Sequence, residues 1–118
     1  MTDDFEDLKN RLREFATARD WEQFHNPKNL AMALIVEAAE LTEHFQWLTP
    51  EQAYSLPEKQ KKEIALEMAD ILIYLSRLSD RLDIDLLAVT NEKIAINEKR
   101  FPPEKVMGNQ DKYIKKSV

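Results

Sequence analysis

The stretch LAMALIVEAAEL, residues 30–41, is apolar at every position except Glu37 and Glu40. Helices that are apolar nearly all round are buried, either within their own subunit or against another chain. Residues three apart in a helix lie on one face, with Cβ atoms about 5–6 Å apart. The stretch therefore predicts a buried helix that carries two carboxylates side by side.

A second stretch, IALEMADILIYL at residues 64–75, repeats this arrangement with Glu67 and Asp70 as its only acids. Glu63 lies one turn earlier on the same predicted face. If the two helices face each other, four carboxylates meet, and each like-charge pair about 6 Å apart costs roughly 3 kcal/mol at an effective dielectric constant of 20. Several such pairs rival the roughly 5–15 kcal/mol that stabilises a typical domain. A positive group is therefore expected between the helices.

Composition restricts the class of protein. The chain has 118 residues, a net charge of −5 and no cysteine. Its length suits one domain, and the missing cysteines exclude disulfides, thiolate metal sites and cysteine nucleophiles. The negative charge argues against binding to nucleic acid. The apolar runs are too short for a membrane span, and no signal sequence opens the chain, so a cytoplasmic location without membrane contact is expected.

The remaining sequence is typical of an all-α protein. Asn26 with Pro27, Thr49 with Gln52, Ser55 and Asp83 are the expected helix starts, because short polar side chains cap helix N-termini and proline fits the first turn. Four long helices are expected at about 4–19, 27–46, 55–82 and 83–100, with a helical turn at 49–52. The predicted fold is an all-α four-helix bundle: one domain at 1–103, followed by a polar tail at 104–118.

Oxygen ligands alone favour a hard cation, so Mg²⁺ is expected, with Mn²⁺ as a substitute. A carboxylate-bridged di-iron bundle would need Glu-x-x-His on two of its helices. The chain has two histidines, and only His25 has a glutamate, Glu22, three residues before it, in a segment that breaks the helical pattern. A rival interpretation pairs the acids with basic residues such as Lys28, Lys93 or Arg100 and needs no metal.

With a single glycine in the chain, a glycine-rich phosphate loop is excluded. Phosphates would have to be held by a metal and by lysine or arginine side chains. Mg²⁺ held by carboxylates commonly completes its coordination with water and substrate phosphates. The pattern therefore favours a metal-assisted hydrolase of phosphoanhydrides.

Glu37-x-x-Glu40 followed by Glu67-x-x-Asp70 resembles the signature of the MazG-like all-α nucleoside triphosphate pyrophosphohydrolases. The segments RDWEQFHNPKNL, EHFQWL, DILIYL and KIAINEKRFP are similar to the dCTP pyrophosphatase branch. The resemblance implies hydrolysis of a nucleoside triphosphate, such as dCTP or a modified dCTP, to the monophosphate and pyrophosphate, in nucleotide pool cleaning.

The resemblance also implies roles for individual residues. The metal ligands and catalytic acids would be Glu37, Glu40, Glu67 and Asp70, with Glu63 as outer support or as the base that orients water. Contacts to base, sugar and phosphates would come from Trp21, His25, Asn26, Pro27, Lys28, Asn29, Trp47, Tyr74, Lys93, Asn97 and Arg100. Two positions depart from the branch: Leu12 stands where it has a histidine, and Phe101 where it has a tyrosine.

The two apolar helices are too apolar on all sides for one 118-residue chain to cover, which predicts a homo-oligomer. The resemblance implies a dimer of dimers. The alternative function is a non-catalytic helical assembly module, whose acids form buried ion pairs between chains and bind no substrate.

Overall fold

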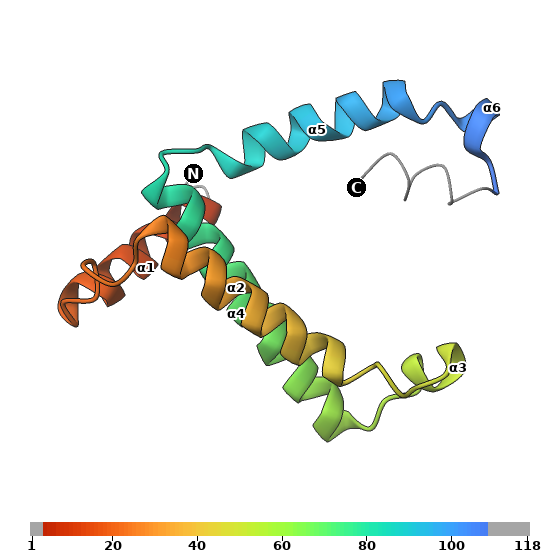
Figure 1. Ribbon diagram of the computed structural model, residues 1–118, viewed down its shortest axis with the longest axis horizontal. Helices are drawn as coiled ribbons and strands as arrows, with labels where there is room; N and C mark the ends of the chain where they lie inside the picture. The colour runs from red at the N-terminus through yellow and green to blue at the C-terminus, as the bar shows by residue number, and fades with distance from the viewer. Residues whose placement is uncertain (1–3, 109–118) are drawn as a thin grey trace. The chain divides into compact units, whose positions relative to one another are not determined.

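The computed structural model describes residues 4–108, and every regular element among them is a helix (Figure 1). The helices are α1 (Asp4–Ala18), α2 (Pro27–Glu43), α3 (Pro50–Ala53), α4 (Glu58–Arg81), α5 (Leu86–Arg100) and α6 (Pro103–Val106). The all-α prediction is confirmed. Across the described residues, no helix is both long enough and apolar enough to pass through a lipid bilayer.

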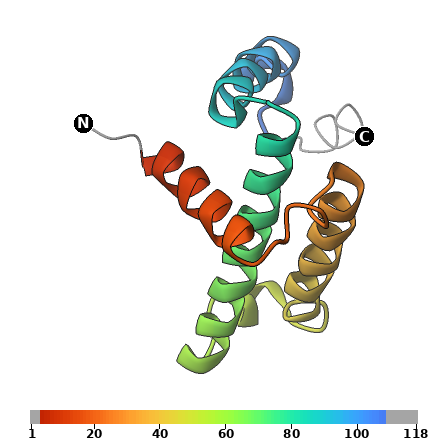
Figure 2. The same ribbon diagram turned by 90° about the vertical axis from the view of Figure 1, so that its left-hand side faces the viewer.

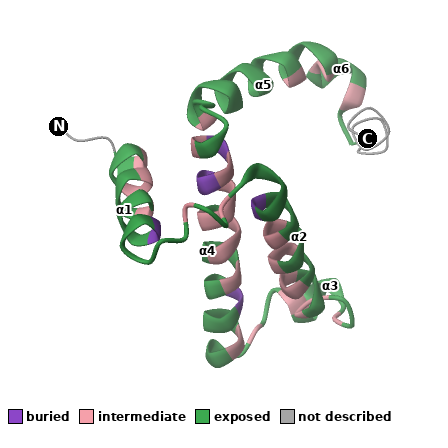
Figure 3. Cartoon of the chain, turned by 60° about the vertical axis from the view of Figure 1, so that its left-hand side comes forward, coloured by how far each residue is buried: buried purple, intermediate pink, exposed green. Residues whose placement is uncertain are grey.

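Contacts within the chain divide it into two units, Met1–Ile84 and Asp85–Val118. In the first unit the long helix α4 lies between α1 and α2 (Figures 2 and 3). α2 packs along α4, and α1 packs against α4 over a shorter length. The second unit contains α5 and α6. Packing of α5 against the other helices, as in a four-helix bundle, stays a prediction.

Two predicted helix starts are confirmed. The side chain of Asn26 accepts a hydrogen bond from the backbone N–H of Asn29 at 2.9 Å, with Pro27 in the first turn of α2. Thr49 and Gln52 form a reciprocal capping box at α3. In both cases the side chain satisfies a backbone donor that the first helical turn leaves unpaired.

Two predicted helix starts are wrong. Ser55 does not cap α4, which begins at Glu58 after Pro57 without a side-chain cap. Asp83 has a φ of 57°, a left-handed conformation, whereas an N-cap residue is extended. Asp85 is extended instead, and its Oδ1 accepts from the backbone N–H of Ala88 at 3.1 Å.

The chain after α5 differs partly from the expected polar tail. Pro103–Val106 forms one turn of helix, α6, which the prediction of a tail from residue 104 did not include. Residues 109–118, the remainder of that predicted tail, lie outside the described residues.

Few apolar side chains are buried within the described chain. Ala16, Leu30 and Ile64 are the buried apolar residues, one on each of α1, α2 and α4. The other buried residues are polar and gather in the last turns of α4 (Figure 3). Polar contacts therefore carry much of the packing at that end of α4.

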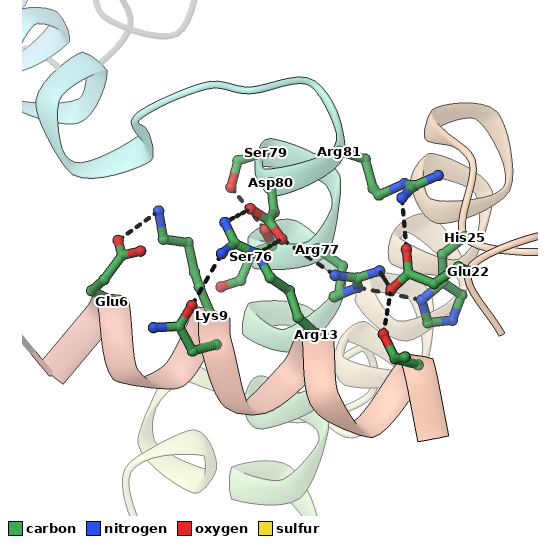
Figure 4. A network of polar contacts seen from close by, with 12 residues as sticks. Glu6, Lys9, Arg13, Glu22, His25, Ser76, Arg77, Ser79, Asp80 and Arg81 are labelled. Atoms are coloured by element: carbon green, nitrogen blue, oxygen red, sulfur yellow. Dashed lines mark hydrogen bonds and ion pairs between the residues drawn. The ribbon is translucent and has the colours of Figure 1, made fainter. Parts of the chain in front are cut away.

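α1 is joined to α4 by a bidentate ion pair. Arg13 Nε donates to Asp80 Oδ2 at 2.7 Å, and Arg13 Nη2 contacts Asp80 Oδ1 (Figure 4). Arg77 Nη1 also donates to Asp80 Oδ2, at 3.3 Å. The hydrogen bonds from Arg13 are the main cause of the lowered pKa of Asp80. Asp80 thus binds two guanidinium groups from two helices.

We expect Asp80→Asn to lower the free energy of unfolding by about 1–3 kcal/mol, because it leaves Arg77 with a weaker acceptor in a buried site. Denaturant unfolding at pH 7 measures this. Asp83→Asn is the matched control, since asparagine tolerates a positive φ. Equal free energies of unfolding for Asp80→Asn and Asp83→Asn would contradict a stabilising role of the contacts of Asp80.

Candidate functional site

Three carboxylates meet between α2 and α4. Glu37 comes from α2, and Glu67 and Asp70 come from successive turns of α4; one oxygen of each lies within 4.8 Å of the others. All three side chains are half-buried. The packing of α2 along α4 is what brings the two acidic pairs of the sequence together.

Two oxygens of this group face no hydrogen-bond donor. Oε2 of Glu37 and Oε2 of Glu67 are buried, and neither has a hydrogen-bond partner among the described residues. The pKa of Glu37 is raised to about 7, first because its protonated form can donate to Glu67, then by burial and by the negative charges of Glu40 and Asp70. Either a proton or a cation must therefore lie between these oxygens.

This donor set fits a hard divalent cation. It offers only oxygen atoms, and two of them are buried and without partners. Carboxylate oxygens bind Mg²⁺ and Mn²⁺ in preference to softer metals, which select nitrogen or sulfur ligands. The group can hold such an ion without displacing an existing contact of Glu37 Oε2 or Glu67 Oε2.

Two predicted acids lie outside this group of three. Glu40 follows Glu37 by one turn and is close enough to raise the pKa of Glu37, yet its oxygens are not among the three that converge. Glu63 is exposed, one turn before Glu67 on α4. Their roles as ligand and as supporting base stay predictions.

A cavity of about 210 Å³ adjoins the carboxylates. Three of the residues predicted to bind substrate, Trp21, His25 and Tyr74, line it together with Asp70 of the acidic group. The other lining residues are Leu12, Phe15, Ile73 and Arg77. One wall of the cavity is thus a carboxylate of the candidate metal site, while the rest is aromatic, aliphatic or basic.

The aromatic rings of the cavity are arranged against one another. The rings of Phe15 and Trp21 meet edge to face with centroids 5.7 Å apart, and Trp21 and His25 are tilted at 6.1 Å. The guanidinium group of Arg19 stacks on the ring of Phe15, with its central carbon 3.7 Å from the ring centroid. Such a set of fixed rings is suited to stacking on a planar ligand.

Other predicted substrate residues are placed elsewhere. The amide group of Asn29 donates to the backbone carbonyl of Phe24 at 3.1 Å, and Asn26 caps α2. Pro27 and Lys28 lie exposed in the first turn of α2, and Trp47 is 86% exposed after its end. The asparagines thus shape the loop that carries Trp21 and His25. Contact of these residues with substrate stays a prediction.

Lys93, Asn97 and Arg100 all lie on α5, in the second unit. Lys93 and Arg100 are exposed and Asn97 is half-buried. Their predicted approach to phosphates stays a prediction.

Arg77 is a residue of the cavity that the sequence did not single out. Its side chain is 3% exposed, and Nη2 lies 3.2 Å from Glu22 Oε1. It also donates from Nε to Nδ1 of His25 at 3.3 Å (Figure 4). The spacing in the sequence does indicate this placement, since positions 67, 70, 74 and 77 lie on one face of a helix.

The profile of the MazG-like family matches residues 32–115. The chain is 39% identical over 110 residues to dCTP pyrophosphatase 1 of Mus musculus and 40% identical over 110 residues to that of Homo sapiens. Each alignment covers 92% of this chain and 65% of the relative, so the chain spans about 65% of the length of these curated relatives.

A solved structure is also similar. The crystal structure of a pyrophosphatase from Archaeoglobus fulgidus superposes with a TM-score of 0.82 at 38% sequence identity. The match covers 86% of this chain and 95% of the archaeal chain.

The raised pKa of Glu37 predicts a pH-dependent stability. Without metal, folded Glu37 keeps its proton to about pH 7, whereas an unperturbed glutamate has a pKa of 4.5. The folded state then binds more protons in this interval, so the free energy of unfolding falls as pH rises from about 4.5 to 7. Mg²⁺ replaces that proton, so it should raise Tm more at pH 8 than at pH 6.

Thermal melts with Mg²⁺ or EDTA at both pH values measure this. Glu37→Gln should be more stable than the wild type in EDTA at pH 8 and should lose most of the response to Mg²⁺. Glu43→Gln, at an exposed position in the last turn of α2, is the control and should keep it. A response to Mg²⁺ that is the same in all three proteins would place the metal elsewhere.

Proposed function

The chain belongs to the MazG-like family, and from this membership we propose that it is a Mg²⁺-dependent nucleoside triphosphate pyrophosphohydrolase. It would release the nucleoside monophosphate and pyrophosphate. Support comes from the similarity to proteins named dCTP pyrophosphatase 1 and to an archaeal pyrophosphatase, and from the site itself.

The observation that carries the proposal is the double position of Asp70. Its carboxylate belongs to the acidic group with Glu37 and Glu67, and it also lines the aromatic cavity. A ligand that fills the cavity with a planar ring therefore extends its other end toward the acids. A nucleotide has this form, with a base at one end and phosphates at the other.

Glu37, Glu67 and Asp70 would hold the ion, with Glu40 as a further ligand. When bound, Mg²⁺ neutralises phosphate oxygens and lowers the pKa of an attacking water. In the reaction a water oxygen would form a bond to the phosphorus on one side of the α–β bridge and release a proton to solvent. The bond between that phosphorus and the bridging oxygen would break, and its electron pair would leave with the bridging oxygen on the other product. Glu63 would help to orient the water from the preceding turn of α4.

Within this class we propose dCTP or a 5-substituted dCTP as the substrate. The cavity, about 210 Å³, is smaller than the roughly 300–1,000 Å³ of most ligand pockets, which favours a single-ring base. Leu12 lies in its lining, at the position where the related branch has a histidine. An apolar side chain at this point removes one polar contact to the base or sugar.

The alternative function is a non-catalytic assembly module, in which lysine or arginine of another chain would pair with the acids. Glu37 Oε2 and Glu67 Oε2 have no hydrogen-bond partner within the described part of the chain, so either a cation or a partner chain would have to neutralise them. A module would gain stability from neutralised acids without any effect of Mg²⁺ or triphosphates.

The test is a panel of canonical and modified triphosphates with Mg²⁺, scored for monophosphate and pyrophosphate. We expect cytidine deoxynucleotides to have the highest kcat/KM. Glu67→Gln and Asp70→Asn should each lower kcat at least about 100-fold, because a metal ligand contributes several kcal/mol to the transition state. Glu63→Gln should cost less, and Glu58→Gln, exposed in the first turn of α4, is the control.

Circular dichroism should show unchanged folding of these variants. Release of the nucleoside diphosphate together with inorganic phosphate would contradict the proposed reaction, and so would full activity in EDTA. A purine triphosphate as the best substrate would contradict only the assignment of the base.

We further propose that the protein is a homo-oligomer. Met32, Ile35 and Val36 share one face of α2 and are 53–65% exposed, and Leu66 and Met68 of α4 are 55% and 57% exposed. Contiguous exposed apolar faces on helices usually mark interfaces. A second copy of the chain is the occupant that fits, because only Ala16, Leu30 and Ile64 form the buried apolar core of the described chain.

Light scattering should give a mass that is a multiple of the 13.9 kDa chain. Ile35→Glu should shift the mass toward the monomer and lower Tm, because it places a charge in the apolar face. Lys59→Glu makes a similar change of charge at an exposed position of α4 and should leave the mass unaltered. A wild-type monomer at micromolar concentration would contradict the oligomer.

A further inference from the structure

The guanidinium group of Arg77 is held by three partners. Nε donates to His25 Nδ1 at 3.3 Å, Nη2 to Glu22 Oε1 at 3.2 Å and Nη1 to Asp80 Oδ2 at 3.3 Å (Figure 4). Each nitrogen is thus directed to a different residue. The side chain of Arg77 is 3% exposed, so its guanidinium group has a fixed orientation. In this orientation Nε is directed at Nδ1 of His25.

Arginine can only donate hydrogen bonds, because its guanidinium carries hydrogens on every nitrogen and stays protonated in proteins. The Nδ1 atom that faces Arg77 Nε must therefore be an acceptor without a hydrogen. A neutral imidazole carries one hydrogen, so in His25 it resides on Nε2. Burial first, and then the charge of Arg77, lower the pKa of His25, which favours the neutral ring.

We propose that Arg77 is a positioning residue: it fixes His25 as the tautomer with hydrogen on Nε2, so that the cavity beside Asp70 offers a hydrogen-bond donor. Nδ1 is occupied by Arg77, so Nε2 is the polar atom of His25 left for a ligand. The cavity lining contains both His25 and Arg77, so the pair lies in the wall of the cavity that would receive the base.

The inference rests on the proposed function and deepens it, because it names what the cavity recognises. A donor at Nε2 selects a base that presents an acceptor on that edge, such as the keto oxygen or unprotonated ring nitrogen of cytosine. The other tautomer would present an acceptor there and favour an exocyclic amino group. The tautomer therefore decides which edge of the base is bound.

NMR of the wild type at a pH where His25 is neutral tests the tautomer directly. The chain contains two histidines, His25 and His44, so His44→Gln assigns the signals. Two-bond and three-bond ¹H–¹⁵N correlations should show Nδ1 of His25 as the unprotonated nitrogen and Nε2 as the protonated one. A proton on Nδ1 in the neutral ring would overturn the proposal.

Arg77→Met removes the donors and keeps the length of the side chain. We expect His25 to become a mixture of tautomers and KM for dCTP to rise about 3- to 10-fold, the effect of one hydrogen bond, with a smaller change in kcat. Arg77→Lys keeps a charged donor, so it should restore part of the tautomer preference of His25 and part of the affinity for dCTP. Arg81→Met is the control, because Arg81 shares Glu22 with Arg77 and its side chain is 39% exposed.

A purely structural role for Arg77 would lower Tm in Arg77→Met and leave the tautomer of His25 and KM like those of Arg81→Met, which would overturn the proposal. If Arg77→Met does not fold, the wild-type tautomer and the comparison of Arg77→Lys with Arg81→Met decide in its place. The spectra need no turnover, so they separate this inference from the proposed function. If His25 carries its hydrogen on Nε2 but the protein hydrolyses no triphosphate, the result would support the role of Arg77 and contradict the proposed function.

Discussion

The rest of the site depends on the repulsion between Glu37 and Glu67 across the seam of α2 and α4. Two of their oxygens are buried without a donor among the described residues, and the packing of α2 along α4 brings the two carboxylates together. A like-charge contact over about 4–5 Å costs about 3–4 kcal/mol at an effective dielectric constant of 20. A proton relieves it at low pH, and on the proposed function Mg²⁺ would relieve it at the same place. Folding and metal binding would then be coupled through the same atoms.

In the last turns of α4, by contrast, acids and bases are paired. Arg77 and Arg81 face Glu22 there, while Arg77 also contacts Asp80. The acids of this end are neutralised by guanidinium groups, whereas Glu37 and Glu67 have none. That contrast is the physical reason to propose a cation for the acids between α2 and the middle turns of α4, and none for the acids beside its last turns. It also explains why the loop with Trp21 and His25 is held against α4.

The sequence was sufficient to predict the helices and the meeting of their acids, because apolar periodicity and the spacing of Glu67 and Asp70 are local properties. Helix starts were less certain. Ser55 and Asp83 have the chemistry of a cap, but the backbone chooses among neighbouring candidates, and the left-handed φ of Asp83 could not be inferred from residue type. Arg77 was missed for another reason. An arginine in a helix is usually solvated, and its burial follows from partners more than fifty residues earlier in the chain.

Four residues of the site lie along one face of α4: Glu67, Asp70, Tyr74 and Arg77. A helix rises about 1.5 Å per residue, so these four positions span about 15 Å along one continuous helix. On the proposed function, phosphates lie at the first of these positions and the base toward the last. Asp70 joins the two parts, because it belongs to the acidic group and also lines the cavity. An insertion of one residue in this part of α4 would turn the later positions by about 100° around the helix axis, so Tyr74 and Arg77 would no longer share a face with Glu67 and Asp70.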